Sequence, residues 1–231
     1  MLAKCGGGLM EIFKMAEDEA THNIKNNFDT RTRMIFNQAI FAGYAKLNTW
    51  LKDDINAFLL SYEKEARGRV INWAVDYFLK QYIDEEMIPF KYTSEYTKNG
   101  AFKFLSIHDL DKKMELTINQ VSNKNMVARK AKNRDEKLEG FQSSLILDEK
   151  SKEIIMDDKP FYYQLNHGYQ GIEPNFIMLG IPTQSNNWLA SIDISKELFL
   201  LSDTKSITTT QVKAKSPDIS ELLEVLKEEK R

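Results

Sequence analysis

The residues best suited to chemistry form a run of cations from residue 122 to residue 137, here called the basic segment. Against only Asp135 and Glu136, it carries Lys124, Arg129, Lys130, Lys132, Arg134 and Lys137. Such a run can neutralise several backbone phosphates, and each contact adds a salt-sensitive contribution to affinity. The segment holds no aromatic residue on which a base could stack, which favours a grip on a DNA or RNA backbone over base reading. The alternative is a solvated connector between two strands.

A peptide with the pattern of a docking motif follows the basic segment. In Gln142-Ser-Ser-Leu145-Ile146, a glutamine is followed three and four residues later by apolar side chains. This is similar to the motif by which bacterial partners dock on the replicative sliding clamp, although Ile146 replaces the usual final aromatic residue. A few such anchors can supply most of the affinity of an extended peptide. We therefore predict Gln142, Leu145 and Ile146 as clamp contacts, against the alternative of a strand with Leu145 and Leu147 in the core.

A histidine and two carboxylates stand close together in His108-Asp109-Leu-Asp111. If Glu95 or Glu115 converges on them, they offer ligands for a hard divalent ion. A metal-dependent nuclease of the restriction-enzyme type needs an acidic residue, and then a strand carrying an acidic residue, a spacer and a lysine. The strand in question supplies Glu115-Leu-Thr117 and lacks the lysine. Asp109, Asp111 and Glu115 are the catalytic residues of this alternative, a divalent metal is its only cofactor, and ordinary acidic turns are the simpler interpretation.

Polar aromatic and amide side chains crowd residues 162–170. A strand here with Tyr163 and Leu165 facing inward places Tyr162, Gln164 and Asn166 on the opposite face, because side chains alternate along a strand. Such a face suits a ligand groove, a partner surface or the edge of a domain. The chain offers no phosphate-cradling glycine loop, and outside the nuclease alternative we expect no cofactor.

Helical periodicity dominates residues 10–86. In residues 31–51 the apolar side chains recur every three or four residues, at Phe36, Ile40, Tyr44, Leu47 and Leu51. This spacing predicts an amphipathic helix. A second helix is expected around residues 55–62, and residues 67–83 are apolar around most of the helical circumference, which predicts a buried central helix.

After residue 87 the apolar period changes to two, which predicts strands. Residues 88–96, 101–108 and 114–119 are expected to form a meander whose first turn contains Asn99-Gly100, a dipeptide that favours positive φ. Further strands are expected at 145–147, 154–156, 161–166, 176–181 and 188–194. Asp218 followed by Glu221 is a capping-box pattern that predicts a short C-terminal helix.

These elements predict an α+β fold in which an N-terminal helical half packs on a mostly antiparallel C-terminal sheet, followed by a short C-terminal helix. The boundaries that we expect are a flexible leader at 1–9, a helical region at 10–86, a β region at 87–215 and the helix at 216–231. Together they are expected to form one structural unit.

Composition narrows the setting of the protein. The formal net charge is −2 and the pI is about 6.0, so a nucleic-acid role must depend on a local basic patch. No apolar run approaches the roughly 20 residues that span a bilayer, and no signal peptide is evident. Cys5 is the only cysteine, which favours a reducing cytoplasm and rules out an internal disulfide. Residues 1–9 also match the translation of a ribosome-binding site ahead of Met10, the alternative being a Gly-rich leader.

Four stretches resemble a family of uncharacterised proteins of Gram-positive bacteria and their prophages. They are residues 116–121 (LTINQV), 129–131 (RKA), 142–146 (QSSLI) and 161–169 (FYYQLNHGY). The resemblance extends over about half of the chain. The resemblance implies a bacterial, cytosolic setting and brings no activity with it.

Three functional hypotheses follow from the sequence. The first is a nucleic-acid or replication-linked binding protein that grips phosphates with Lys124, Arg129, Lys130, Lys132 and Arg134 and docks on the sliding clamp. The second is a metal-dependent nuclease or another hydrolase. The third is a protein-interaction module without nucleic-acid binding. The sequence leaves the oligomeric state open.

Overall fold

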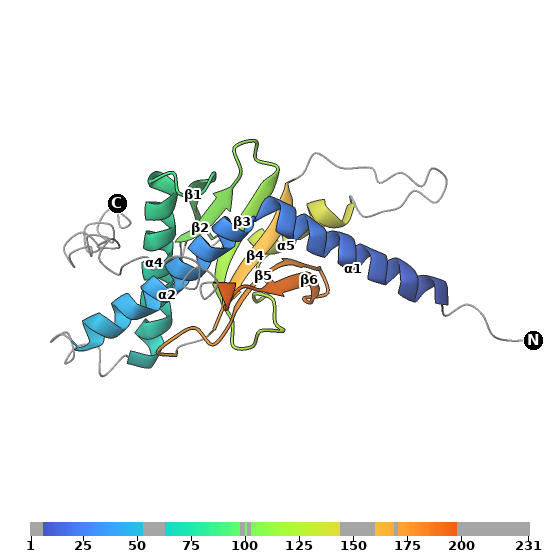
Figure 1. Ribbon diagram of the computed structural model, residues 1–231. Coiled ribbons are helices and arrows are strands. Elements are labelled where there is room, and N and C mark those ends of the chain that lie inside the picture. The colour runs from blue at the N-terminus through green and yellow to red at the C-terminus, as the bar shows by residue number, and fades with distance from the viewer. Residues whose placement is uncertain are drawn as a thin grey trace, which may run out of the picture. The chain divides into compact units, whose positions relative to one another are not determined.

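The computed structural model of the protein describes residues 7–52, 63–97, 100, 103–143, 160–168 and 171–197. All of them belong to one unit of the chain, Met1–Leu198. The helices of this unit are α1 (Gly7–Asn27), α2 (Thr30–Lys52), α4 (Glu63–Asp84) and α5 (Lys132–Ser143). Its strands are β1 (Lys91–Tyr96), β2 (Lys103–His108), β3 (Met114–Gln120), β4 (Phe161–His167), β5 (Ile177–Pro182) and β6 (Trp188–Asp193) (Figure 1).

The strands form one six-stranded sheet in the order β1-β2-β3-β4-β5-β6. Every neighbouring pair is antiparallel except β3 and β4, which run parallel and are connected by the part of the chain that contains α5. A parallel pair cannot be joined by a tight hairpin, so this connection has to leave the sheet and return to it. The α+β class, the N-terminal helices and the meander of β1, β2 and β3 are confirmed. Gly100, in the first turn of the meander, has the expected positive φ of 66°.

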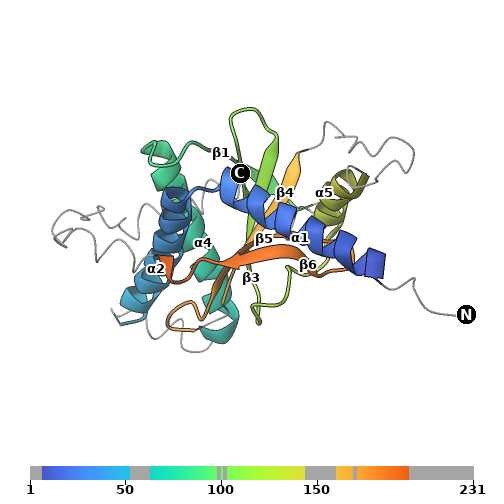
Figure 2. The ribbon, with the colours of Figure 1, turned by 45° about the vertical axis from the view of Figure 1, so that its right-hand side comes forward.

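The two faces of the sheet differ in what covers them. On one face, α1, α2 and α4 pack over an apolar core that includes Phe28, Phe36, Ile71, Leu165 and Leu179, all fully buried (Figures 1 and 2). We call the opposite face, which carries Glu115, Thr117, Asn119, Tyr162, Gln164 and Asn166, the outer face. Helix α5 packs beside β4 on this outer face, because its Lys137 contacts Glu115.

The helices follow the predicted stripes, with one correction. Phe36, Ile40, Tyr44 and Leu47 of α2 are buried as expected, and the side chain of Leu51 lies outside the described residues. In α4 only one face is fully buried: Trp73, on another face, is 39% exposed, so the prediction of a helix buried around most of its circumference was too strong. Gly43 allows α2 and α4 to approach closely, because a Cβ atom there would lie 2.9 Å from the backbone nitrogen of Val75.

Several predicted boundaries also change. Helix α1 begins at Gly7, inside the predicted leader, and α5 replaces the C-terminal part of a segment for which the simpler interpretation was a connector. The last described strand ends at Asp193. The helix expected at 55–62, the strands expected at 145–147 and 154–156, and the C-terminal helix at 216–231 all lie outside the described residues. Within the part of the chain that is described, no helix is both long enough and apolar enough to cross a membrane.

A buried histidine lies between the sheet and α2. The Tyr44 hydroxyl donates a hydrogen bond to the Gly168 carbonyl and lies 3.0 Å from Nδ1 of His167. Because the hydroxyl proton is used in that way, Nδ1 carries the ring proton and donates to the Tyr44 oxygen. The His167 side chain is fully buried, and burial lowers the pKa of His167 to about 4. The fold therefore requires a neutral imidazole.

We predict that this histidine makes the folded state acid-sensitive. Between pH 6.5, the ordinary pKa, and about 4, the unfolded chain binds a proton at His167 that the folded protein does not. The free energy of unfolding should therefore fall by about 1.4 kcal/mol for each pH unit across that window, on the order of 3 kcal/mol in all. Denaturant unfolding of wild type and His167→Asn at several pH values measures the difference. The same slope in both proteins would contradict the assignment, and exposed His22→Asn is the matched control.

Candidate nucleic-acid interface

The first part of the basic segment crosses the outer face of the sheet. Residues 121–131 connect β3 to α5 without forming a helix or strand, yet Val127 and Ala128 are buried. An irregular segment with buried backbone must find hydrogen-bond partners outside regular secondary structure. The outer face of the sheet supplies them.

Side chains from β4, β6 and α5 hold this segment at four points of its backbone. The hydrogen bonds run from Trp188 Nε1 to the Lys124 carbonyl (3.2 Å), from Asn166 Nδ2 to the Met126 carbonyl (3.2 Å), from the Ala128 amide to Gln164 Oε1 (2.9 Å) and from Arg134 Nη1 to the Arg129 carbonyl (2.6 Å). Because these bonds are made to the backbone, the exposed side chains of Lys124 and Arg129 remain available for other contacts.

The holding side chains are themselves linked in a buried network. Asn119 Nδ2 donates to Asn166 Oδ1 at 3.1 Å, and Arg134 Nη2 donates to Asn119 Oδ1 at 2.9 Å. The hydroxyls of Thr117 and Tyr162 lie 2.7 Å apart, and burial raises the pKa of Tyr162. Buried amides and hydroxyls that satisfy one another fix the orientation of each member. The network therefore gives the segment a rigid support.

The predicted alternation of side chains between the two faces of strand β4 is confirmed. Tyr163 and Leu165 face the helices, whereas Tyr162, Gln164 and Asn166 lie on the outer face and are buried. The amides hold a segment of the same chain, so they do not line an open groove. A ligand would meet the segment that they support.

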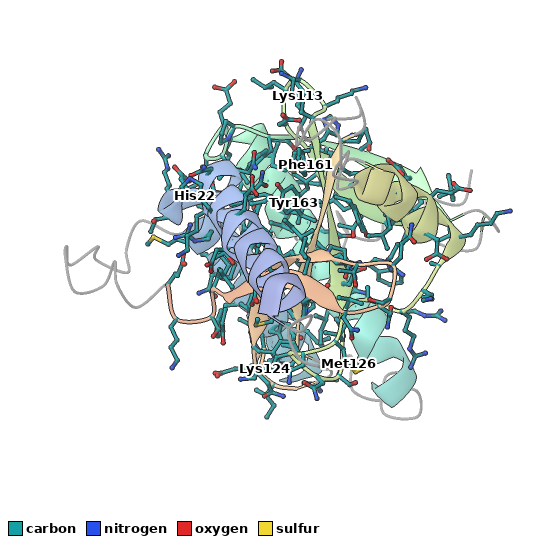
Figure 3. All side chains as sticks on the ribbon, turned by 90° about the vertical axis from the view of Figure 1, so that its right-hand side faces the viewer. His22, Lys113, Lys124, Met126, Phe161 and Tyr163 are labelled. Atoms are coloured by element: carbon teal, nitrogen blue, oxygen red, sulfur yellow. The ribbon has the colours of Figure 1, made fainter. Side chains whose placement is uncertain are left out.

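The predicted phosphate contacts divide into two groups. Lys124, Arg129, Lys130 and Lys132 are exposed, and none of these side chains makes a hydrogen bond or ion pair with any described residue. Arg134 is half-buried, and its guanidinium donates hydrogen bonds to the Arg129 carbonyl and to Asn119 Oδ1. Arg134 is therefore best understood as a positioning residue. In Figure 3, Lys124 and Met126 lie together at the bottom of the view, and Lys113 lies at the top.

A small hollow lies between the basic segment and the β5–β6 turn. Its wall on one side is formed by Val127–Lys130, Arg134, Asp135 and Leu138, and on the other by Pro182, Thr183, Gln184 and Asn186, with Gln164 also contributing. Its enclosed space is about that of one water molecule. A nucleotide cannot enter it, so a larger ligand has to bind across the rim.

A second cluster lies on the same face, around Lys137 of α5. Its ammonium group contacts Oε1 of Glu115 and lies 3.4 Å from Oε2 of Glu95, and Ser106 donates to the same Glu115 oxygen. The side chains of Lys137 and Glu115 are only 18% and 15% exposed. Strand β3 carries no lysine two residues after Glu115, but α5 brings one to it through space.

The other carboxylates of the nuclease hypothesis have structural partners. Asp109 Oδ1 accepts a hydrogen bond from the Met114 amide across the β2–β3 turn, and exposed Asp111 lies 3.8 Å from the ammonium of Lys113. Glu115 pairs instead with Lys137. Among the described residues, no three His, Cys, Asp or Glu side chains gather closely enough to hold a metal ion.

The predicted clamp-docking peptide is only partly described. Gln142 lies in the last turn of α5, whose final residue is Ser143. Leu145 and Ile146 lie outside the described residues. Because the docking motif binds as an extended peptide, binding through Gln142 requires this last turn to unwind.

Sequence reasoning missed the residues that contact the basic segment but lie far from it in sequence. Asn119, Trp188 and the turn at 182–186 lie next to the basic segment, but no spacing rule connects them to it. The one available signal was the unusual density of amides in β3 and β4, since buried amides require partners.

Comparison with protein-family models, curated proteins and solved structures gave no match to this chain.

We predict that Gln164→Leu loosens the basic segment without changing its charge. The substitution removes the acceptor of the buried Ala128 amide, which should lower the free energy of unfolding by about 1–3 kcal/mol. Hydrogen exchange should accelerate at the Ala128 amide and remain unchanged at Ile107 in β2. The matched control is Gln184→Leu, at an exposed glutamine on the rim of the same hollow. Unchanged protection at Ala128 would show that Gln164 does not hold the segment.

Proposed function

We propose that this protein binds nucleic acid through the sugar-phosphate backbone, using the exposed cations of the basic segment. The observation that supports the proposal most directly is the way the segment is held: four hydrogen bonds fix its backbone while Lys124, Arg129, Lys130 and Lys132 remain exposed. A fixed row of cations loses less conformational entropy on binding than a flexible one.

The charge distribution supports a polyanion as the ligand. The chain as a whole has a formal charge of −2, so attraction to a polyanion must come from this local surface. Contacts made by Lys and Arg to phosphates carry little sequence information. We therefore propose binding with low sequence preference and strong salt dependence, in the cytoplasm, where nucleic acid is accessible.

The exposed cations can be tested as a group. In Arg129→Ala/Lys130→Ala/Lys132→Ala, the slope of log affinity against log salt should become shallower by about two to three units. Each phosphate contact that is lost removes the counterion release that this contact contributed to binding. Fluorescence anisotropy with labelled DNA and RNA at several salt concentrations measures this slope. The matched control is Lys91→Ala/Lys112→Ala/Lys113→Ala, which removes the same charge from three exposed lysines near the β2–β3 turn. Equal losses in both variants would indicate a general effect of charge and end the proposal.

Docking on the sliding clamp remains a second part of this proposal. It depends on Gln142, Leu145 and Ile146, and it is independent of the basic segment. Capture of the clamp by wild type but not by Gln142→Ala, with unchanged DNA affinity, would support it.

The contact between Lys137 and Glu115 favours a second candidate, a metal-dependent nuclease. Glu95, Glu115 and Lys137 supply two carboxylates and a lysine, the set that the β3 sequence alone lacks. Mg²⁺ is commonly bound by one or two carboxylates together with substrate phosphates, so a bound nucleic acid could complete such a site. Glu95 and Glu115 would hold the ion, which would supply Lewis-acid activation of water for hydrolysis of a phosphodiester bond.

This candidate predicts cleavage of DNA or RNA that requires Mg²⁺ or Mn²⁺ and is lost in Glu115→Gln. Asp111→Asn, which changes an exposed carboxylate 3.8 Å from the ammonium of Lys113, should cleave like wild type. Gel assays of single- and double-stranded substrates measure both. Absence of cleavage by the wild-type protein with either ion would remove the nuclease candidate and leave the binding proposal intact.

A further inference from the structure

Trp188 places an aromatic ring beside the basic segment, which has none of its own. It is the first residue of β6, far from the segment in sequence, and its indole Nε1 donates to the Lys124 carbonyl at 3.2 Å. The residue is half-buried, so part of it stays in contact with solvent.

A glycine on the neighbouring strand makes room for the ring. Gly180 of β5 pairs with Gln164, so both lie on the outer face of the sheet. A Cβ atom on Gly180 would lie 2.8 Å from Cε3 of Trp188. The ring therefore packs over the glycine, beside the small apolar cluster of Val121, Phe176 and Met178. Packing and one hydrogen bond hold it in place.

The ring lies beside the basic segment. Its indole Nε1 donates to the carbonyl of Lys124. Pro182, the pairing partner of Trp188 in the β5–β6 hairpin, lines the hollow together with Arg129 and Lys130. Met126, between Lys124 and Arg129 in sequence, adds an apolar side chain that is 44% exposed. This surface combines positive charge with apolar contact area.

We infer that the ligand of this surface is single-stranded nucleic acid, with a base in contact with Trp188 while the cations grip the phosphates. The inference rests on the proposed function and narrows it. Stacking on an aromatic ring needs a base whose face is open, and a duplex keeps those faces within its own stack. The hollow has space for about one water molecule, so a base cannot be read inside it and must lie on the surface. An aromatic ring next to exposed cations is an arrangement that binds single strands with little sequence preference.

Trp188 can report on its own contact. The chain has three tryptophans, so the full-length protein with Trp50→Phe and Trp73→Phe leaves Trp188 as the single indole fluorophore. The probes are an oligothymidine, a DNA duplex of equal length and inorganic polyphosphate. We expect the oligothymidine to quench Trp188 fluorescence and to bind roughly tenfold more tightly than the duplex, with no quenching by polyphosphate.

Two substitutions at Trp188 distinguish stacking of a base on the ring from packing of the side chain over Gly180. Trp188→Leu keeps an apolar side chain over Gly180 but cannot stack, so it should weaken oligothymidine binding roughly tenfold and leave duplex and polyphosphate binding unchanged. Trp188→Phe should restore most of the affinity, and the circular dichroism spectrum of each variant verifies folding. Binding of single strand and duplex with equal affinity and no quenching would overturn this inference but retain the phosphate grip. No binding to any of the three probes would overturn both proposals.

Discussion

The structure depends on how the outer face of the sheet satisfies its buried polar groups. Strands β3 and β4 place Thr117, Asn119, Gln164 and Asn166 there, each less than a tenth exposed. A buried amide without a partner costs about 1–3 kcal/mol, so such a face cannot simply be covered by apolar side chains. The protein covers it with the backbone of residues 121–131, whose amide and carbonyl groups need partners equally. Gln164 and Asn166 bond to this backbone, whereas Thr117 and Asn119 pair with Tyr162, Asn166 and Arg134.

This exchange of hydrogen bonds explains why a basic segment can be rigid without being a helix or strand. Lysines and arginines on flexible loops bind phosphates weakly, because ordering the loop opposes binding. Here four bonds from three elements have already ordered it. The cations of the segment have different roles: Arg134 holds the backbone at Arg129, and the exposed cations are left to contact a ligand. Lys137 occupies a similar place one turn further along α5, between Glu115 and Glu95.

Local periodicity was enough to predict the class of the fold and much of its face assignment. The helical stripe of α2 and the alternation in β4 each follow from the geometry of a single element, so Tyr44 and Leu165 could be assigned to the core from sequence. The outer-face position of Gln164 followed in the same way. What covers that face could not be predicted, because the contacts of Gln164 with Ala128 and of Trp188 with Lys124 join residues 36 and 64 positions apart. The pairing of Lys137 with Glu115 is of the same kind: a motif incomplete along β3 is completed from α5.

The central claim is that the basic segment and the turn beside it form the surface that meets nucleic acid. It is tested most directly by titrating isotope-labelled full-length protein with oligothymidine and following the backbone amide resonances by NMR. We expect chemical-shift changes confined to residues 124–134 and 183–188, which saturate together and become weaker as salt is added. Shifts centred instead on the β2–β3 turn, or no shifts at low salt, would contradict it.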